Sequence, residues 1–151
     1  MIRAALAASF LLAFASAVAT AADPPAAKAA APTIALSIAT ADGPRRFHVE
    51  IASTPAEQER GLMFRRSMKA DHGMIFPMSP PRPVSFWMKN TLIPLDIIFI
   101  GPDHMISSIA ARATPMSLAT IDSFSPVSAV LELNGGTCER LGIQPGDRVA
   151  W

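Results

Sequence analysis

Residues 86–100 read FWMKNTLIPLDIIFI, an apolar run interrupted by a polar triplet and by one aspartate. In its second half, 95–100, both strand faces are apolar except at Asp96, which predicts a central strand that is covered on both sides. A carboxylate there is costly unless hydrogen-bond donors or a cation compensate it. We expect Asp96 to tie the preceding loop, 89–91, into a fixed shape.

Glu132 poses the same problem in a second predicted strand, 129–133, where it shares a face with Val130. If this strand lies beside 95–100, Asp96 and Glu132 could form the carboxyl pair of a general acid and a general base. The alternative is two acids at separate strand ends, each bonded to backbone donors. We favour this alternative because the sequence alone does not bring the two residues together.

Alternation of apolar and polar residues predicts short strands separated by turns rich in glycine and proline. These strands are 34–38, 47–51, 73–76, 84–88, 95–100, 105–111, 129–133 and 148–151. The pattern predicts a mainly β (α+β) fold, a compact single-domain β-sandwich or barrel with one or two short helices.

Two helices are expected within this β-rich frame. Thr54, Pro55 and Glu57 form a capping box with proline at the first helical position, which predicts a helix to about Arg65 or Arg66. A shorter helix is expected to start at 134–136 and to end near Gly142.

The N-terminus has the pattern of a secretory signal peptide, with Arg3 followed by an apolar run and then small residues. We predict a signal peptide at 1–22, an Ala/Pro-rich linker at 23–32 and a single β-rich domain at 33–151. The expected product is periplasmic or secreted, with no stable membrane insertion after cleavage.

The charge balance argues against a nucleic-acid partner, and the cysteine count excludes an intrachain disulfide. Without Arg3, 12 Lys and Arg residues face 12 Asp and Glu residues, whereas nucleic-acid binding normally requires a strong basic bias. We therefore expect no nucleic-acid partner. Cys138 is the single cysteine, so no intrachain disulfide can form, and we interpret it as a buried structural thiol.

Six short motifs occur in an order that resembles domain of unknown function family 192, a family of small bacterial and archaeal proteins that are often exported. They are Gly61–Arg65, Gly73–Phe76, Phe86–Thr91, Pro94–Phe99, Val130–Leu133 and Gly142-Ile143 with Gly146-Asp147. The resemblance covers about 45–150 and implies a compact β-rich fold, but no activity. The chain departs from the pattern at 122–125, where it has Asp-Ser-Phe-Ser and many members have Cys and Tyr.

The preferred hypothesis is a non-enzymatic binding module for a small molecule or an envelope protein, without a cofactor and without catalytic residues. An aromatic side chain beside polar loop groups is typical of a recognition pocket. The candidate ligand-binding residues are Trp87, Met88, Lys89, Asn90, Thr91, Asp96, Arg65 and Glu132.

Two other functions are carried as alternatives. The first is a periplasmic copper-binding protein, because thioethers suit Cu(I); its candidate ligands are His72, Met74, Met78 and Met88. Methionine also fills gaps in protein cores, and we favour that interpretation. The second is a carboxylate-based hydrolase that would use Asp96 and Glu132.

Overall fold

The structure, a computed structural model, describes residues 31–151. The predicted signal peptide and most of the predicted linker lie outside the described residues. Residues 31–151 form nine strands and two short helices, which confirms the prediction of a mainly β domain with one or two short helices. No helix within this range is long and apolar enough to span a membrane.

Seven strands form one mixed sheet, and two form a separate small sheet. The large sheet has the order β6-β5-β8-β3-β2-β1-β9, and β4 pairs with β7. Only the β2–β3 pair is parallel among these strands. The bounds are β1 Ile34–Thr40, β2 Gly43–Ile51, β3 His72–Arg82, β4 Ser85–Phe86, β5 Leu95–Ile100, β6 Ile106–Ala113, β7 Ile121–Asp122, β8 Val127–Asn134 and β9 Arg148–Ala150.

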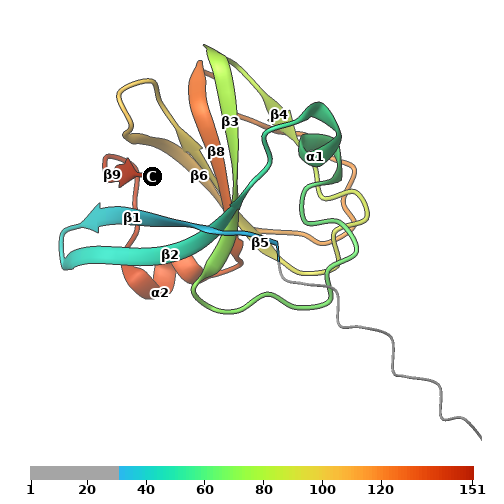
Figure 1. Cartoon of the computed structure of the whole chain (residues 1–151), viewed down its shortest axis with the longest axis horizontal. Coiled ribbons are helices and arrows are strands. Elements are labelled where there is room, and N and C mark those ends of the chain that lie inside the picture. The colour runs from blue at the N-terminus through green and yellow to red at the C-terminus, as the bar shows by residue number, and fades with distance from the viewer. Residues whose placement is uncertain (1–30) are drawn as a thin grey trace, which may run out of the picture. The chain divides into compact units, whose positions relative to one another are not determined.

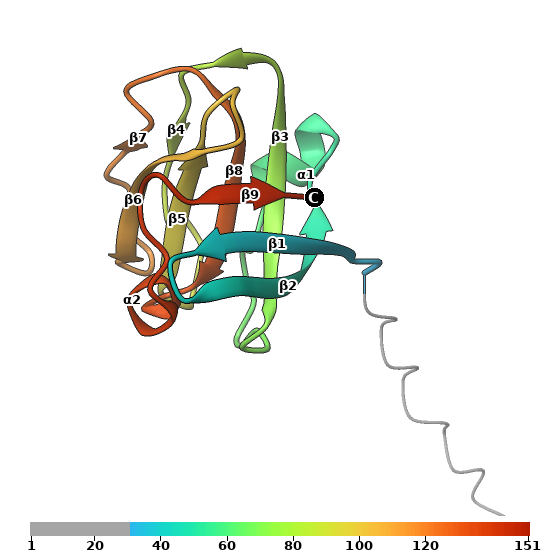
Figure 2. The same cartoon turned by 90° about the vertical axis from the view of Figure 1, so that its left-hand side faces the viewer.

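The large sheet is not closed into a barrel, so the barrel alternative is wrong and the sandwich-like one is supported. The two edges are linked only locally, by an isolated bridge between Met105 and Arg148 and by three backbone hydrogen bonds around it. In Figure 2, β1, β2 and β9 cross in front of β5, β6 and β8. The strong twist of the sheet thus makes two layers from one continuous sheet.

Two apolar clusters fill the two faces of the central strands. One lies between the crossing layers and includes Ile38, Val49, Ile98 and Leu131. The other covers the opposite face and includes Leu62, Phe76, Phe99 and Val130. Every residue of β5 is buried, and its side chains alternate between the two clusters, as predicted for a central strand.

The helix α1, Pro55–Arg60, begins with the predicted capping box. The Glu57 N–H donates to the Thr54 hydroxyl, and the Glu57 carboxylate accepts from the Thr54 N–H at 2.9 Å. The helix ends at Arg60 rather than at Arg65 or Arg66, because Gly61 adopts a φ of 45° and its N–H closes the last turn. In Figure 1, a short connection leads from the end of β2 to α1.

Strand β3 is longer than the prediction of 73–76 because it continues past Pro77. Prolines lack a backbone donor, and the pairing of β3 with β8 shifts register between Pro77 and Arg82. In Figure 2 the end of β3 curves over the top of the domain, and Met78 lies in the second apolar cluster. Arg82, at its end, thereby reaches the edge of the cavity described below.

Asp96 is fully buried, and three backbone N–H groups compensate its carboxylate. The Arg112 and Gly136 N–H groups donate to Oδ1 and the Cys138 N–H donates to Oδ2, each at 2.8 Å. The prediction that Asp96 binds the 89–91 loop is wrong. Its donors instead lie on β6 and at the start of α2, Thr137–Leu141. Asp96 is an architectural residue that joins β5 to both elements.

Cys138 sits in the same region and behaves as a structural thiol. It is 3 % exposed, and burial together with the Asp96 carboxylate raises the pKa of its thiol far above the usual range. A thiol with a raised pKa holds its proton and makes a poor nucleophile.

Replacing Asp96 should test this architecture. Asp96→Ala leaves three buried N–H groups without an acceptor, and we expect it to lower the free energy of unfolding by about 3 kcal/mol or more. Asp42→Ala, at an exposed position, should change it by less than about 0.5 kcal/mol. Both values come from urea denaturation monitored by circular dichroism, and equal midpoints for the two variants would contradict the role of Asp96.

Candidate functional site

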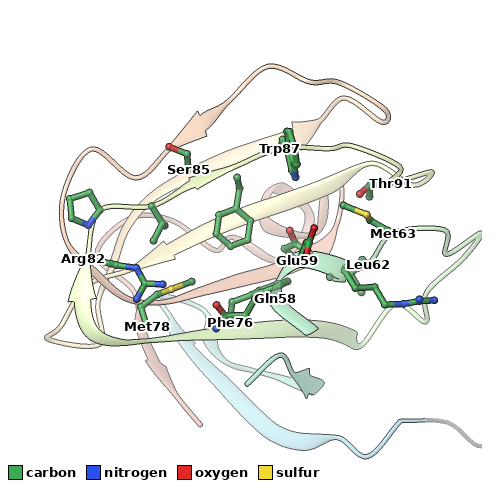
Figure 3. Close-up of a pocket in the computed structure, with 16 residues that line it drawn as sticks. Gln58, Glu59, Leu62, Met63, Phe76, Met78, Arg82, Ser85, Trp87 and Thr91 are labelled. Carbon is green, nitrogen blue, oxygen red and sulfur yellow. The ribbon is translucent and has the colours of Figure 1, made fainter. Parts of the chain in front are cut away.

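A cavity of about 470 Å³ opens on the sheet face that carries the second apolar cluster. The end of α1 and the following turn, strand β3, and the 82–87 segment supply most of its wall. Figure 3 shows Arg82 and Met78 at one end of the cavity and Met63 and Thr91 at the other. The apolar part of the wall is formed by Leu62, Met63, Phe76, Met78, Val84, Phe86 and Trp87.

Glu132 brings a buried carboxyl group to the apolar part of this wall. On β8, Glu132 lies between Ile97 of β5 and Met74 of β3, and both of these residues are paired with it. Both neighbours are buried, and paired residues point to the same face of a sheet. The sheet therefore surrounds the base of the Glu132 side chain with hydrocarbon.

The Glu132 side chain is largely buried, and its carboxyl group has no hydrogen-bond partner among residues 31–151 but keeps some access to the cavity. The residue is 5 % exposed, and none of the hydrogen bonds or salt bridges found in residues 31–151 involves its side chain. Burial alone raises its pKa from 4.5 to about 8. The carboxyl is therefore mostly neutral at pH 7, and it can donate one hydrogen bond to a group within the cavity.

Asp96 and Glu132 do not form the carboxyl pair that the hydrolase alternative requires. Their strands are neighbours, but Asp96 pairs with Leu133, and Glu132 pairs with Ile97. Successive residues of a strand point to opposite faces, so the two acids lie on opposite sides of the sheet. One is bonded to backbone donors, and the other faces the cavity.

Aromatic rings form one side of the cavity and hold each other in place. The Phe86 ring meets Phe76 edge-on at a centroid distance of 5.2 Å, and meets Phe99 in the same way at 6.4 Å. Trp87 is 45 % exposed, and the Lys89 Nζ lies 4.9 Å from its ring centroid. The wall thus combines two packed phenylalanines with a tryptophan that remains partly open to solvent.

Asn90 and Thr91 connect the loops that surround the cavity. The Phe64 N–H donates to the Asn90 carbonyl at 2.8 Å, and the Met116 N–H donates to the Thr91 carbonyl at 3.1 Å. Asn90 adopts a φ of 55°, a left-handed conformation that asparagine tolerates better than most residues. Its amide also lies 3.8 Å from the Met63 sulfur.

The end of α1 is fixed against the sheet by one side chain and one glycine. The Gln58 amide donates to the carbonyls of Ala52 and Pro77 at 3.2 and 3.0 Å. A Cβ atom at Gly61 would lie 3.3 Å from the Phe76 ring, so a glycine allows this close approach. The helix end is therefore a fixed part of the wall.

Of the residues predicted from the sequence, Trp87, Thr91 and Glu132 line the cavity. Met88 is buried in the second apolar cluster. Arg65 instead forms a bidentate pair with Glu50, with Nη2 at 2.6 Å from Oε2. This hydrogen bonding raises the pKa of the Arg65 guanidinium.

Sequence reasoning missed the contribution of the α1 end and of Arg82. The residues it did not single out as site candidates are Gln58, Glu59, Arg60, Gly61, Leu62, Met63, Phe76, Arg82, Pro83, Val84, Ser85 and Phe86. The family resemblance contained a signal for these residues. Four of its six motifs each contribute at least one residue to the cavity wall.

Three of the four candidate copper ligands are buried methionines, and one of these, Met78, also lines the cavity. Met74, Met78 and Met88 are buried within the second apolar cluster, which supports the core-filling interpretation. The His72 Nδ1 lies 2.8 Å from the Asp71 carboxylate. Among the described residues, no group of three or more His, Cys, Asp or Glu side chains is arranged to hold a metal ion. The copper alternative stays a prediction.

Comparisons with known proteins agree on the family. Residues 37–151 match DUF192, described as an uncharacterized ACR. The crystal structure of a proposed transcription regulator from Sinorhizobium meliloti is 46 % identical, with a TM-score of 0.77, and the match covers 82 % of this chain and 97 % of that one. A protein of unknown function from Novosphingobium aromaticivorans is 44 % identical, with a TM-score of 0.79 and coverages of 88 and 94 %. No curated protein matches the chain.

The raised pKa of Glu132 predicts how stability depends on pH. Between pH 4.5 and about 8, the folded protein holds the Glu132 proton more tightly than the unfolded chain. Its contribution is therefore fully present below pH 4.5 and is lost as the pH rises to about 8, by up to about 1.4 kcal/mol per pH unit.

Glu132→Gln, which cannot ionise, should remove this dependence and be the more stable protein at pH 9. The measurement is the free energy of unfolding of both proteins in urea at several values from pH 5 to pH 9. Parallel curves for the two proteins over that range would contradict an uncompensated, buried carboxyl.

Proposed function

We propose that this chain, which belongs to the DUF192 family, binds a small molecule in the cavity beside Glu132. The observation that carries the proposal is the buried Glu132 carboxyl that faces the cavity and has no partner among the described residues. Burying a polar group without a hydrogen bond costs free energy. Such a cost is explained when a bound molecule supplies the missing partner.

The shape and composition of the cavity support this role. Its volume of about 470 Å³ falls within the range that is typical of small-molecule sites, roughly 300–1,000 Å³. Typical sites also combine apolar walls with a few polar groups, and here aromatic rings lie beside one buried carboxyl and a few rim charges. The fixed α1 end and the mutually packed rings indicate that the cavity is already formed before a ligand enters.

A binding role also explains the arrangement better than catalysis does. The only two buried glutamate and aspartate side chains of the paired strands β5 and β8 point to opposite faces, so Asp96 does not assist Glu132. The lone thiol of Cys138 is on the Asp96 side of the sheet. We therefore propose a binding protein rather than a hydrolase.

The N-terminal pattern of residues 1–22 supports export of this binding protein to the periplasm or the medium. The charge of this chain gives no support to the transcription-regulator role proposed for the Sinorhizobium relative. The formal net charge of this chain is +1, whereas a DNA-binding domain normally carries clustered excess cations.

A variant that blocks the cavity provides the test. Glu59 is exposed and lies on the cavity wall, and Figure 3 shows it between the two ends of the cavity, so Glu59→Trp should fold and obstruct the opening. We expect some members of a library of small amphipathic compounds to shift the amide NMR signals of Trp87, Thr91 and Glu132. Glu59→Trp should weaken their binding by about tenfold or more, which corresponds to about 1.4 kcal/mol.

The matched control is Ser67→Trp, because Ser67 is also exposed but lies outside the cavity wall. This variant should bind the same compounds as the wild type. The proposal fails if no compound shifts these three signals, or if Glu59→Trp binds the compounds as tightly as Ser67→Trp does.

A further inference from the structure

The charged groups on the cavity wall are unevenly distributed. Besides Glu132, they are Glu59, Arg60 and Arg82, and all three are exposed. Neither arginine takes part in the salt bridges that residues 31–151 form. Because Glu132 is mostly neutral at pH 7, two cations and one anion remain, so the rim is positive on balance.

Arg82 is the cation that the fold places most directly at this rim. It ends β3 after the proline-containing part of the strand, and in Figure 3 its guanidinium lies beside Met78 at one end of the cavity. A guanidinium group can hold a carboxylate, phosphate or sulfonate through two parallel hydrogen bonds. A ligand could make this contact while its charged group stays in water.

We propose, building on the binding function above, that the ligand is a small amphipathic organic anion. Its anionic group contacts Arg82 at the rim, and its apolar body lies against Phe86 and Trp87. Its far end carries a hydrogen-bond acceptor, such as a carbonyl or hydroxyl oxygen, that accepts the proton of the Glu132 carboxyl.

A cationic ligand fits these observations less well. It would have to pass the two arginines and then pair with an ionised Glu132 between Ile97 and Met74. An ion pair in such surroundings loses most of its Coulomb energy to desolvation of both charges. A neutral carboxyl that donates one hydrogen bond requires no buried charge.

Two probes that differ in one charged group test the anion preference. Anilinonaphthalene sulfonate and phenylnaphthylamine share their ring system, but only the former carries a sulfonate. We expect the wild-type protein to bind the sulfonate about tenfold more tightly, the usual size of one charge-assisted contact. Arg82→Gln should remove this preference. Arg46→Gln, at an exposed position on β2, should keep it.

The pH dependence of sulfonate binding tests the role of Glu132. Affinity for the wild type should fall as the pH rises through about 8, because the donor proton is lost and a negative charge appears in the cavity. Glu132→Gln keeps a donor and cannot ionise, so it should bind the sulfonate without this pH dependence. Both proteins contain the same other charged groups, so these groups cannot cause a difference between them. They are Glu59, Arg60 and Arg82 of the wall, and His72, which precedes Met74 by two residues on β3.

The outcomes separate this inference from the proposed function. Titrations would use the two probes and, as a cation, naphthylmethylammonium, each followed by fluorescence and calorimetry. If none of the three binds, the proposed function fails together with the inference. If a probe binds but the neutral or cationic one binds as tightly as the sulfonate, or if sulfonate affinity rises through pH 8, only the inference of an anionic ligand is overturned.

Discussion

The alternation of side chains along two paired central strands determines how this protein is organised. Strands β5 and β8 are antiparallel neighbours, and each carries one carboxyl group into a region that is apolar on both faces. The register sends Asp96 to one face and Glu132 to the other. Two acids that are close in the sheet consequently have different environments and different roles.

On the first face, the cost of burying Asp96 is offset by three backbone donors. Because two of these donors lie at the start of α2 and one lies on β6, the carboxylate fixes the position of both elements. On the second face, the donors are missing, and burial shifts the pKa of Glu132 upward instead. The domain thus combines a fully compensated acid that stabilises the fold with an uncompensated acid that faces a cavity.

Local sequence patterns predicted the elements of the fold well, since they depend on neighbouring residues. The apolar run around Asp96 predicted a strand that is buried on both sides, and the capping box of Thr54 and Glu57 located the start of α1. The partners of Asp96 could not be predicted in this way. Gly136 and Cys138 are 40 and 42 residues away, and only the packed fold brings them to the carboxylate.

Local sequence patterns also predicted only part of the candidate site. Trp87, Thr91 and Glu132 stood out because of their residue types, but Arg82 reaches the cavity only because β3 continues past Pro77. Arg65 was also a candidate, but its guanidinium forms a bidentate pair with the Glu50 carboxylate on β2.

The most direct test of the account is an NMR titration of the Glu132 side-chain carboxyl carbon in the free protein. The account predicts a midpoint near pH 8, whereas a midpoint near pH 4.5 would show a solvated carboxylate and contradict it.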